Sequence, residues 1–259
     1  MRRILLTTLI GLGMMSLAAA PASAADAKPA KIKVLLITGD DVGAHKWREM
    51  SEATRDVLVA GGKFDVKVCE DIYILDSANA LKNYDLVFLS YYNTKPVNLS
   101  DQAKENLLGF VKGGKGFAIS HLSSASFAGK DAAGQPVAWD EFRKLAGRYW
   151  VMGKSGHGPR SVFKAKIANK DHAITKGLED FDQDDELYAK LLGDAPINVL
   201  VTAESSWSKQ TEPLAFTLEY GQGRVFHECF GHDGPAIKNP SVAKLIQRGC
   251  EWAATGKVD

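Results

Sequence analysis

The chain has 259 residues, a formal net charge of +1 and 45% hydrophobic side chains. This hydrophobic content is sufficient for a large core, while the near-neutral charge and dispersed basic residues disfavour a nucleic-acid partner or an anionic membrane surface. The three cysteines, Cys69, Cys229 and Cys250, are too few for a disulfide framework. One bridge or buried free thiols remain the alternatives.

The first 24 residues have the features of a secretory signal peptide. Met1-Arg2-Arg3 is a basic start, residues 4–20 are apolar, and small residues with an A-x-A cleavage pattern follow at 21–25. The apolar run is short for a membrane span, so we expect cleavage and a periplasmic or secreted protein without membrane attachment; an uncleaved anchor is the alternative. Cleavage would leave about 235 residues, the size of one large domain, and change the formal charge from +1 to −1.

After a linker at residues 25–31, strand-like and helix-like segments alternate. Glycine pairs end both helices, and Ser100 is placed to cap the second one. Continuous apolar runs are typical of parallel strands buried on both faces. In chain order the expected elements are strand 33–38, helix 47–60, strands 64–69 and 84–90, a helix from Ser100 to Gly113, and strand 116–120. This order predicts a three-layer, doubly wound α/β fold with a mostly parallel sheet and right-handed crossovers.

The second half of the chain is less regular. Residues 162–167 alternate like a half-exposed strand, and 198–202 form another apolar run. Residues 214–219 and 224–229 flank a Gly-rich turn and predict a hairpin, and a final helix extends from Asn239 to about Ala254. We therefore expect a single domain over residues 32–256, with an inserted region at about 129–194.

Several of the six histidines fall where strands of such a sheet would end. His45 follows the first expected strand, His121 follows the fourth, and His232 follows the last. Ligands of open α/β sheets bind at the carboxyl ends of the strands, and imidazole is both a common metal ligand and an acid/base near neutral pH. His157 lies in a turn-rich stretch, and Glu186 is the acidic residue of cluster 182–186 that we expect to turn inward. These five residues are expected to share one site.

Their residue types suggest a division of roles. His121, Glu186 and His232 would hold a divalent metal, zinc first, which would polarise a substrate carbonyl or activate water. His45 and His157 would act as acid and base.

Two aromatic residues, Trp47 and Tyr92, would stack on a sugar substrate. The simpler alternatives are a solvent-facing His45, a Trp47 that packs the helix start, and a structural His121 that bonds its loop. The rest of the acidic cluster is expected to be solvated, and His172 to cap a turn.

Some chemistries are disfavoured by missing motifs. The turn from Gly39 to Trp47 contains neither G-x-G-x-x-G nor a P-loop, so no nucleotide cofactor is expected. The turn after the fourth strand carries Ser120-His121 without a G-x-S-x-G motif or a cysteine, which disfavours an acyl-enzyme. A conventional glycosidase needs two opposed carboxylates, and only Glu186 is assigned.

Five segments in order resemble the trehalose-utilisation (ThuA-like) family over nearly the whole mature chain. They are Thr38-Gly39 with His45-Lys46-Trp47, Gly114 to His121, Asp171 to Leu178, Asp185-Glu186-Leu187-Tyr188, and Gly223-Arg224-Val225-Phe226 with Gly231-His232-Asp233. The resemblance implies a flavodoxin-like sheet related to class I glutamine amidotransferases. It also implies a role in sugar metabolism, on a disaccharide, a glucoside or its keto derivative.

Glutamine hydrolysis itself is not expected, because the cysteine nucleophile is absent. Phe226-His227-Glu228 matches the His-x-Glu end of the amidotransferases only over a short pattern. Cleavage, isomerisation and binding of a small sugar all remain open. The competing class is a non-catalytic periplasmic carbohydrate-binding or accessory protein.

Overall fold

The computed structural model describes residues 30–40, 42–93, 99–130 and 133–259. The expected signal peptide and most of the linker lie outside the described residues. Lys31–Asp259 form one compact unit, as expected for a single domain. No helix within the described ranges is long and apolar enough to cross a membrane.

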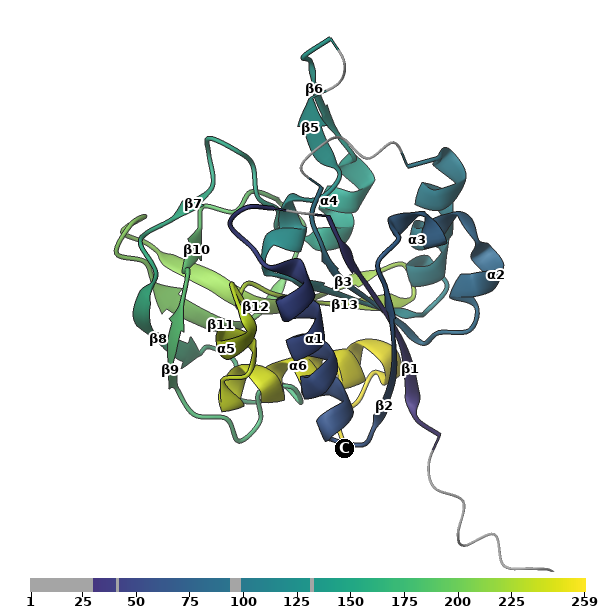
Figure 1. Ribbon diagram of the computed structural model, residues 1–259. Coiled ribbons are helices and arrows are strands. Elements are labelled where there is room, and N and C mark those ends of the chain that lie inside the picture. Colours follow the sequence, from purple (N-terminus) through teal and green to yellow (C-terminus); the bar gives the residue numbers. More distant parts are fainter. Residues whose placement is uncertain (1–29, 41, 94–98, 131–132) are drawn as a thin grey trace, which may run out of the picture. The chain divides into compact units, whose positions relative to one another are not determined.

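A nine-stranded sheet forms the centre of this unit (Figure 1). Across the sheet the strands are β2 (Phe64–Cys69), β1 (Ile32–Gly39), β3 (Leu86–Tyr91), β4 (Gly116–Ser120), β13 (Gly223–Glu228), β12 (Thr211–Tyr220), β11 (Asn198–Glu204), β8 (Ser161–Ile167) and β9 (Phe181–Asp185). The first five pair in parallel, and every pairing from β13 to β9 is antiparallel. Only β12 and β8 of these strands therefore run against the other seven, so the predicted mostly parallel direction is confirmed.

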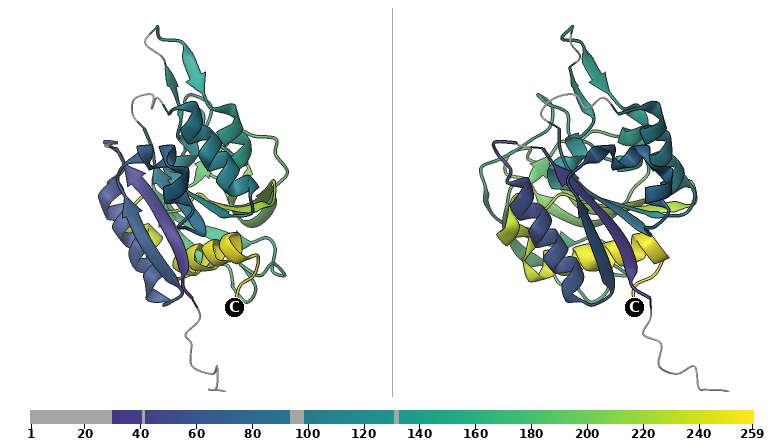
Figure 2. Two further views of the ribbon diagram at one scale, coloured as in Figure 1. Left: turned by 90° about the vertical axis from the view of Figure 1, so that its right-hand side faces the viewer. Right: turned by 45° about the vertical axis from the view of Figure 1, so that its right-hand side comes forward.

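Helices cover both faces of the sheet, as Figure 2 shows. On one face lie α1 (Trp47–Ala60), α5 (Gly234–Ile237) and α6 (Pro240–Thr255); on the other lie the short helices η1 (Ile72–Asp76) and α2 (Ala78–Leu81) with α3 (Asp101–Lys112) and α4 (Asp140–Ala146). Alternate residues of β1 face the two layers: Val34 and Leu36 pack under α1, whereas Leu35 and Ile37 pack on the α3 side. Two apolar cores with the sheet between them confirm the predicted three-layer fold.

Polar capping residues in the sequence correctly predicted where two of the helices begin. The Ser100 hydroxyl accepts a hydrogen bond from the Ala103 N–H at 2.9 Å and begins α3, as its N-cap position predicts. Asn239 caps α6 in the same way through the Ser241 N–H. All three cysteines are free thiols; Cys229 and Cys250 are buried as expected, whereas Cys69 is partly exposed.

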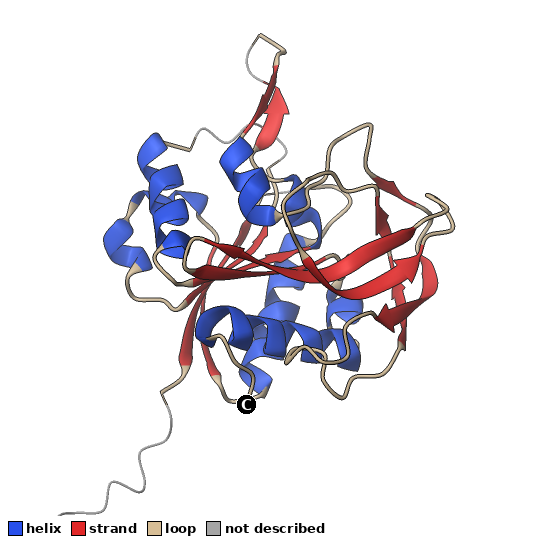
Figure 3. Cartoon of the chain, turned by 180° about the vertical axis from the view of Figure 1, so that it is seen from behind, coloured by secondary structure: helices blue, strands red, loops and turns tan. Residues whose placement is uncertain are grey.

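The inserted region does not form a separate layer. Its strands β8 and β9 extend the central sheet at the far edge from β2, seen from behind in Figure 3. The short helix η2 (His121–Ala125) precedes this region, and two small ladders complete it. The ladders are β5 (Ala128–Lys130) with β6 (Pro136–Ala138), and β7 (Gly156–His157) with β10 (Tyr188–Ala189).

Candidate metal and sugar site

The candidate site lies at the edge of the sheet where the strands that run together reach their carboxyl ends. Each of five strands is followed by a site residue within six residues of the strand end. They are β1 before His45, β3 before Tyr92, β4 before His121, β13 before His232 and β9 before Glu186.

His121 occupies the sharp turn that follows β4. Its φ of 47° lies in the left-handed region that a residue with a side chain seldom adopts, so the turn holds His121 in a defined direction. The imidazole is fully buried, and its Nδ1 lies 2.8 Å from the Cys229 carbonyl oxygen. Because Nδ1–H must donate to that oxygen, the lone pair of neutral His121 is on Nε2.

His45 and His232 converge on this lone pair. His45 Nε2 is 3.1 Å from His121 Nε2. The backbone N–H of His45 donates to the Val42 carbonyl and so closes the loop after β1. His232 follows Gly231, whose φ of 99° requires glycine. The His45 ring centroid is 4.7 Å from that of His232, so three imidazoles from separate strand ends share one small volume.

Glu186 completes the cluster. Its Oε2 lies 3.1 Å from His232 Nδ1, 3.8 Å from His121 Nε2 and 4.0 Å from His45 Nε2. Glu186 Oε2 and His232 Nδ1 are buried, and no described residue gives either one a hydrogen bond of normal geometry. Buried polar atoms that converge without a hydrogen-bond partner form an arrangement that a cation can satisfy.

The spacing of the four ligand atoms suits a metal ion. One atom from each of His45, His121, Glu186 and His232 lies within 4.8 Å of the other three. A tetrahedral ion with ligands at about 2.0–2.1 Å separates its ligand atoms by about 3.3 Å, so small movements would close this set around zinc.

The electrostatics keep the buried imidazoles neutral. Burial, helped by repulsion from the neighbouring histidines, lowers the pKa of His45 to about 3. Burial also lowers the pKa of His121 to about 3, although the Cys229 carbonyl opposes that shift. Neutral imidazole is the form that binds a metal.

Asp185 is a functional residue that the sequence analysis missed. We expected it to be solvated with its acidic neighbours, but it is fully buried. Its carboxylate accepts the N–H groups of Gly231 at 2.7 Å, His232 at 3.1 Å and Glu186 at 2.8 Å. Alternate residues of β9 are buried, which brings Asp185 inward; this period-two pattern was the available signal.

His157 forms the outer wall of the cluster. It lies opposite Tyr188 in the β7–β10 ladder, and its side chain is 34% exposed. Its Nδ1 lies 2.7 Å from the Gly158 carbonyl oxygen, so Nδ1 donates and Nε2 faces Glu186 Oε2 at 3.5 Å. The structure thus brings together all five polar residues that the sequence placed in one site.

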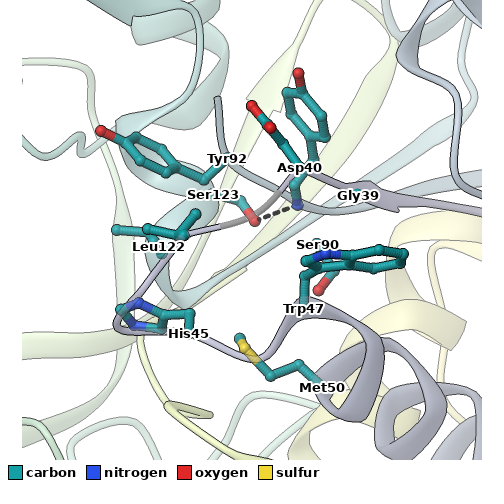
Figure 4. A pocket seen from close by; sticks show the side chains of 11 residues that line it. Gly39, Asp40, His45, Trp47, Met50, Ser90, Tyr92, Leu122 and Ser123 are labelled. Carbon is teal, nitrogen blue, oxygen red and sulfur yellow. Dashed lines mark hydrogen bonds between the residues drawn. The ribbon is translucent and has the colours of Figure 1, made fainter. Parts of the chain in front are cut away.

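The two aromatic candidates lie beside His45. Figure 4 shows Trp47 and Tyr92 around a cavity of ≈ 20 Å³, with the Ser123 hydroxyl accepting the Tyr91 N–H at 3.0 Å. That volume holds a water molecule or an ion and not a sugar ring. Trp47 also borders a shallow hollow of ≈ 490 Å³ formed by residues 42, 43 and 45–48. Tyr92 also borders a separate cleft of ≈ 630 Å³.

Two other histidines lie outside the cluster. His227 is buried, and its Nδ1 donates at 2.8 Å to the carbonyl of Ala146, the last residue of α4. It therefore lies under the face of the sheet that α3 and α4 cover. The next residue, Glu228, is also buried, which raises its pKa to about 8. His172 accepts the Ile174 N–H through Nδ1 at 3.2 Å, which confirms its expected capping role.

Comparison with known proteins agrees with this fold. A ThuA-like protein from Parabacteroides merdae is 28% identical, with a TM-score of 0.73 over 88% of this chain and 92% of that one. A ThuA-like protein from Bacteroides uniformis is 16% identical, with a TM-score of 0.66 over 90% and 95%. A β-galactosidase from Rahnella shares the fold alone, at 15% identity and a TM-score of 0.56 over 84% of this chain and 30% of that one.

No curated protein matches the chain at a significant level. The trehalose utilisation family, ThuA, matches residues 33–253, which include the whole histidine cluster. The chain therefore belongs to the ThuA family, as the ordered motifs predicted, and its role is related to carbohydrates.

Proposed function

We propose that this protein is an exported metal-dependent enzyme that acts on a disaccharide, a glucoside or its keto derivative. The observation that carries the proposal is the convergence of three imidazoles on the buried Glu186 Oε2, an oxygen without a hydrogen bond from any described residue. Family membership supports the carbohydrate part of the proposal.

The ligand set that we propose is larger than the one expected from sequence. His121, Glu186 and His232 were expected to hold the metal, with His45 as an acid or base. Since His45 Nε2 lies 3.1 Å from His121 Nε2 and His45 is only 9% exposed, we assign it to the metal as a fourth ligand. Three nitrogens and one carboxylate oxygen fit zinc first among the divalent ions.

A zinc ion held by all four residues would have to accept a sugar carbonyl or water as a fifth ligand in order to supply Lewis acidity. His157 is the residue left to move a proton, because its side chain is partly exposed and its Nε2 faces the cluster. The Gly158 carbonyl holds the ring so that Nε2 is the basic nitrogen. Asp185 is turned toward three backbone N–H groups, so it cannot serve as the second carboxylate of a conventional glycosidase.

The second candidate function is a non-catalytic carbohydrate-binding or accessory protein with the same site. The observation that favours it is the burial of the cluster: His121 is fully buried and His45 nearly so, which limits the approach of a substrate to the proposed metal.

For both candidate functions, we propose export to the periplasm or the exterior, and a small sugar as the partner.

Metal analysis and a thermal-shift screen test the proposal. Purified mature protein should hold one zinc per chain. Disaccharides and keto-sugars should raise the melting temperature of the zinc form by mass action. His232→Ala should lose zinc and the sugar response, whereas the control His172→Ala, outside the cluster, should keep both.

The outcomes separate the candidates. Bound zinc with sugar turnover that stops on chelation supports the enzyme. Sugar binding without turnover supports the accessory protein. Absence of stoichiometric zinc, or stabilisation by non-sugar ligands alone, would contradict the proposal.

A further inference from the structure

The larger cleft beyond Tyr92 has the size of a ligand site. It has a volume of ≈ 630 Å³, within the roughly 300–1,000 Å³ typical of small-molecule sites. Tyr92 and Trp150 form part of its wall, and the β5–β6 hairpin, which projects from the domain in Figure 1, forms another part. The hollow beside Trp47, in contrast, is lined by one short segment, the end of the loop after β1 and the first residues of α1, and is an open surface.

Trp150 connects this cleft to the histidine cluster. Its ring centroid is 4.6 Å from that of Tyr188 and 6.0 Å from that of His157. The backbone N–H of Trp150 donates to the Ser124 carbonyl at 3.2 Å, within the short helix that begins at His121, and its indole N–H donates to Met152 Sδ at 3.3 Å. Trp150 therefore lines the cleft and also neighbours the His157 ring, which itself lies outside the cleft lining.

The cleft lining combines apolar and hydrogen-bonding surface. Met152 and Val137 are 64% and 38% exposed, which is unusual for large apolar residues and leaves surface for a ligand to cover. Arg143 donates to Asp140 at 3.2 Å, so donor and acceptor groups lie side by side in the same wall. Sugars present both apolar C–H faces and hydroxyls, and such a lining suits them.

We infer that this cleft binds the second ring of a disaccharide-sized sugar, with Trp150 as its stacking surface and the first ring toward His157. The inference rests on the proposed function for the identity of the reacting end. It replaces Trp47 with Trp150 as the main aromatic contact and predicts that a disaccharide binds more tightly than a monosaccharide.

Calorimetric titration of the zinc-loaded mature protein with trehalose, maltose and glucose tests the inference. At least one disaccharide should bind about tenfold or more tightly than glucose, because the second ring adds contacts in the cleft. Val137→Arg, which places a long side chain in the cleft, should weaken disaccharide binding by about tenfold or more and leave glucose binding little changed.

Val162→Arg is the matched control, because Val162 is 66% exposed on β8 and outside the cleft. It should leave all affinities unchanged. Trp150→Phe and Trp150→Ala provide a second pair: the phenyl ring should keep most of the disaccharide preference, and alanine should lose it. Thermal unfolding of each variant verifies that it is folded.

Three results would overturn the inference: no disaccharide binds, Val137→Arg and Val162→Arg behave alike, or Trp47→Ala weakens disaccharide binding where Trp150→Ala does not. Zinc stoichiometry keeps the two proposals apart. If the wild type binds no zinc, the proposed function fails; if zinc binds but the cleft variants have no effect, only the cleft assignment fails.

Discussion

The parallel half of the sheet, β2-β1-β3-β4-β13, and its antiparallel extension, β12-β11-β8-β9, contribute different parts of the site. The parallel half places three histidines in the loops after its strands. The extension supplies Glu186 after β9, and the β7–β10 ladder adds His157. The parallel strands bring three histidines to one edge of the sheet because their carboxyl ends meet there. The carboxylate of Glu186 and the partly exposed imidazole of His157 come from the less regular inserted region.

The β12–β13 ladder joins these halves within one sheet, and two side-chain interactions add further connections near the site. Asp185 at the end of β9 accepts N–H groups of Gly231 and His232, which follow β13. At the rim, Arg160 pairs with Asp184 on one side and Asp233 on the other. The first interaction is buried and the second is partly exposed, so they should differ in their contribution to stability.

The largest effect is expected for Asp185→Ala. The substitution leaves three backbone N–H groups without their acceptor in a buried environment, so we expect a loss of about 3–5 kcal/mol in the free energy of unfolding. Asp182→Ala is the control, because Asp182 pairs with Lys164 at the surface and should cost at most about 1 kcal/mol. Urea unfolding measures both. Similar losses for the two variants would show that Asp185 does not join the halves.

Glu186→Gln removes the charge that the extension contributes to the cluster. We expect zinc affinity to fall at least about 100-fold, or about 2.7 kcal/mol, since even outer-shell changes at metal sites cost 10–100-fold. Competition with a chelator of known affinity gives the value. The exposed Glu179→Gln should be unchanged, and His157→Gln should change little because His157 lies outside the four-ligand group. A fall as large in His157→Gln would require a different ligand set.

Acid should destabilise the zinc-free protein through histidines of the parallel half. Burial holds the pKa of His45 and His121 at about 3 and that of His227 at about 4, against about 6.5 in the unfolded chain. The unfolded chain therefore takes up protons below about pH 6.5 that the folded chain refuses, and stability should fall as pH falls.

Glu228 acts in the opposite direction. Its pKa of about 8 means that the folded chain holds a proton that the unfolded chain releases above about pH 4.5. Three histidines outweigh one glutamate between pH 6 and 5, where we expect a loss on the order of 2 kcal/mol. Chemical unfolding at both pH values provides the measurement, and constant or rising stability toward pH 5 would contradict the assigned neutral histidines.

Arg160→Ala should have the smallest effect. Because Arg160 lies at a partly exposed rim, we expect a loss of about 1 kcal/mol or less in the free energy of unfolding, decreasing further in high salt. A loss comparable to that of Asp185→Ala would mean that the rim, rather than the buried carboxylate, holds the halves together. Lys164→Ala, which breaks a surface pair within the extension alone, is the control.

The same comparison explains what the sequence could predict. Strands β1, β3 and β4 of the parallel half are largely continuous apolar runs, so the strand ends that precede His45 and His121 were located from pattern alone. The end that precedes His232 was located from the hairpin pattern around β12 and β13. The convergence of these ends follows from the parallel direction. Glu186 was selected from its acidic cluster because two apolar residues follow it.

Other features depend on contacts between segments distant in sequence. The alternation along β9 turns Asp185 inward, but its partners Gly231 and His232 follow another strand, and no local pattern encodes that pairing. The placement of His45 against His121, and of Trp150 against Tyr188, likewise depends on how loops pack over the strand ends. The expected export signal lies outside the described residues and stays a prediction.

The most direct test of the four-ligand site is X-ray absorption spectroscopy of the zinc-loaded protein. The account predicts one zinc per chain with three imidazole nitrogens and one carboxylate oxygen at about 2.0–2.1 Å. The spectrum should change to two imidazoles in His45→Ala if that variant still retains zinc. Sulfur at about 2.3 Å, a single imidazole, or loss of all zinc on dialysis of the wild type would contradict it.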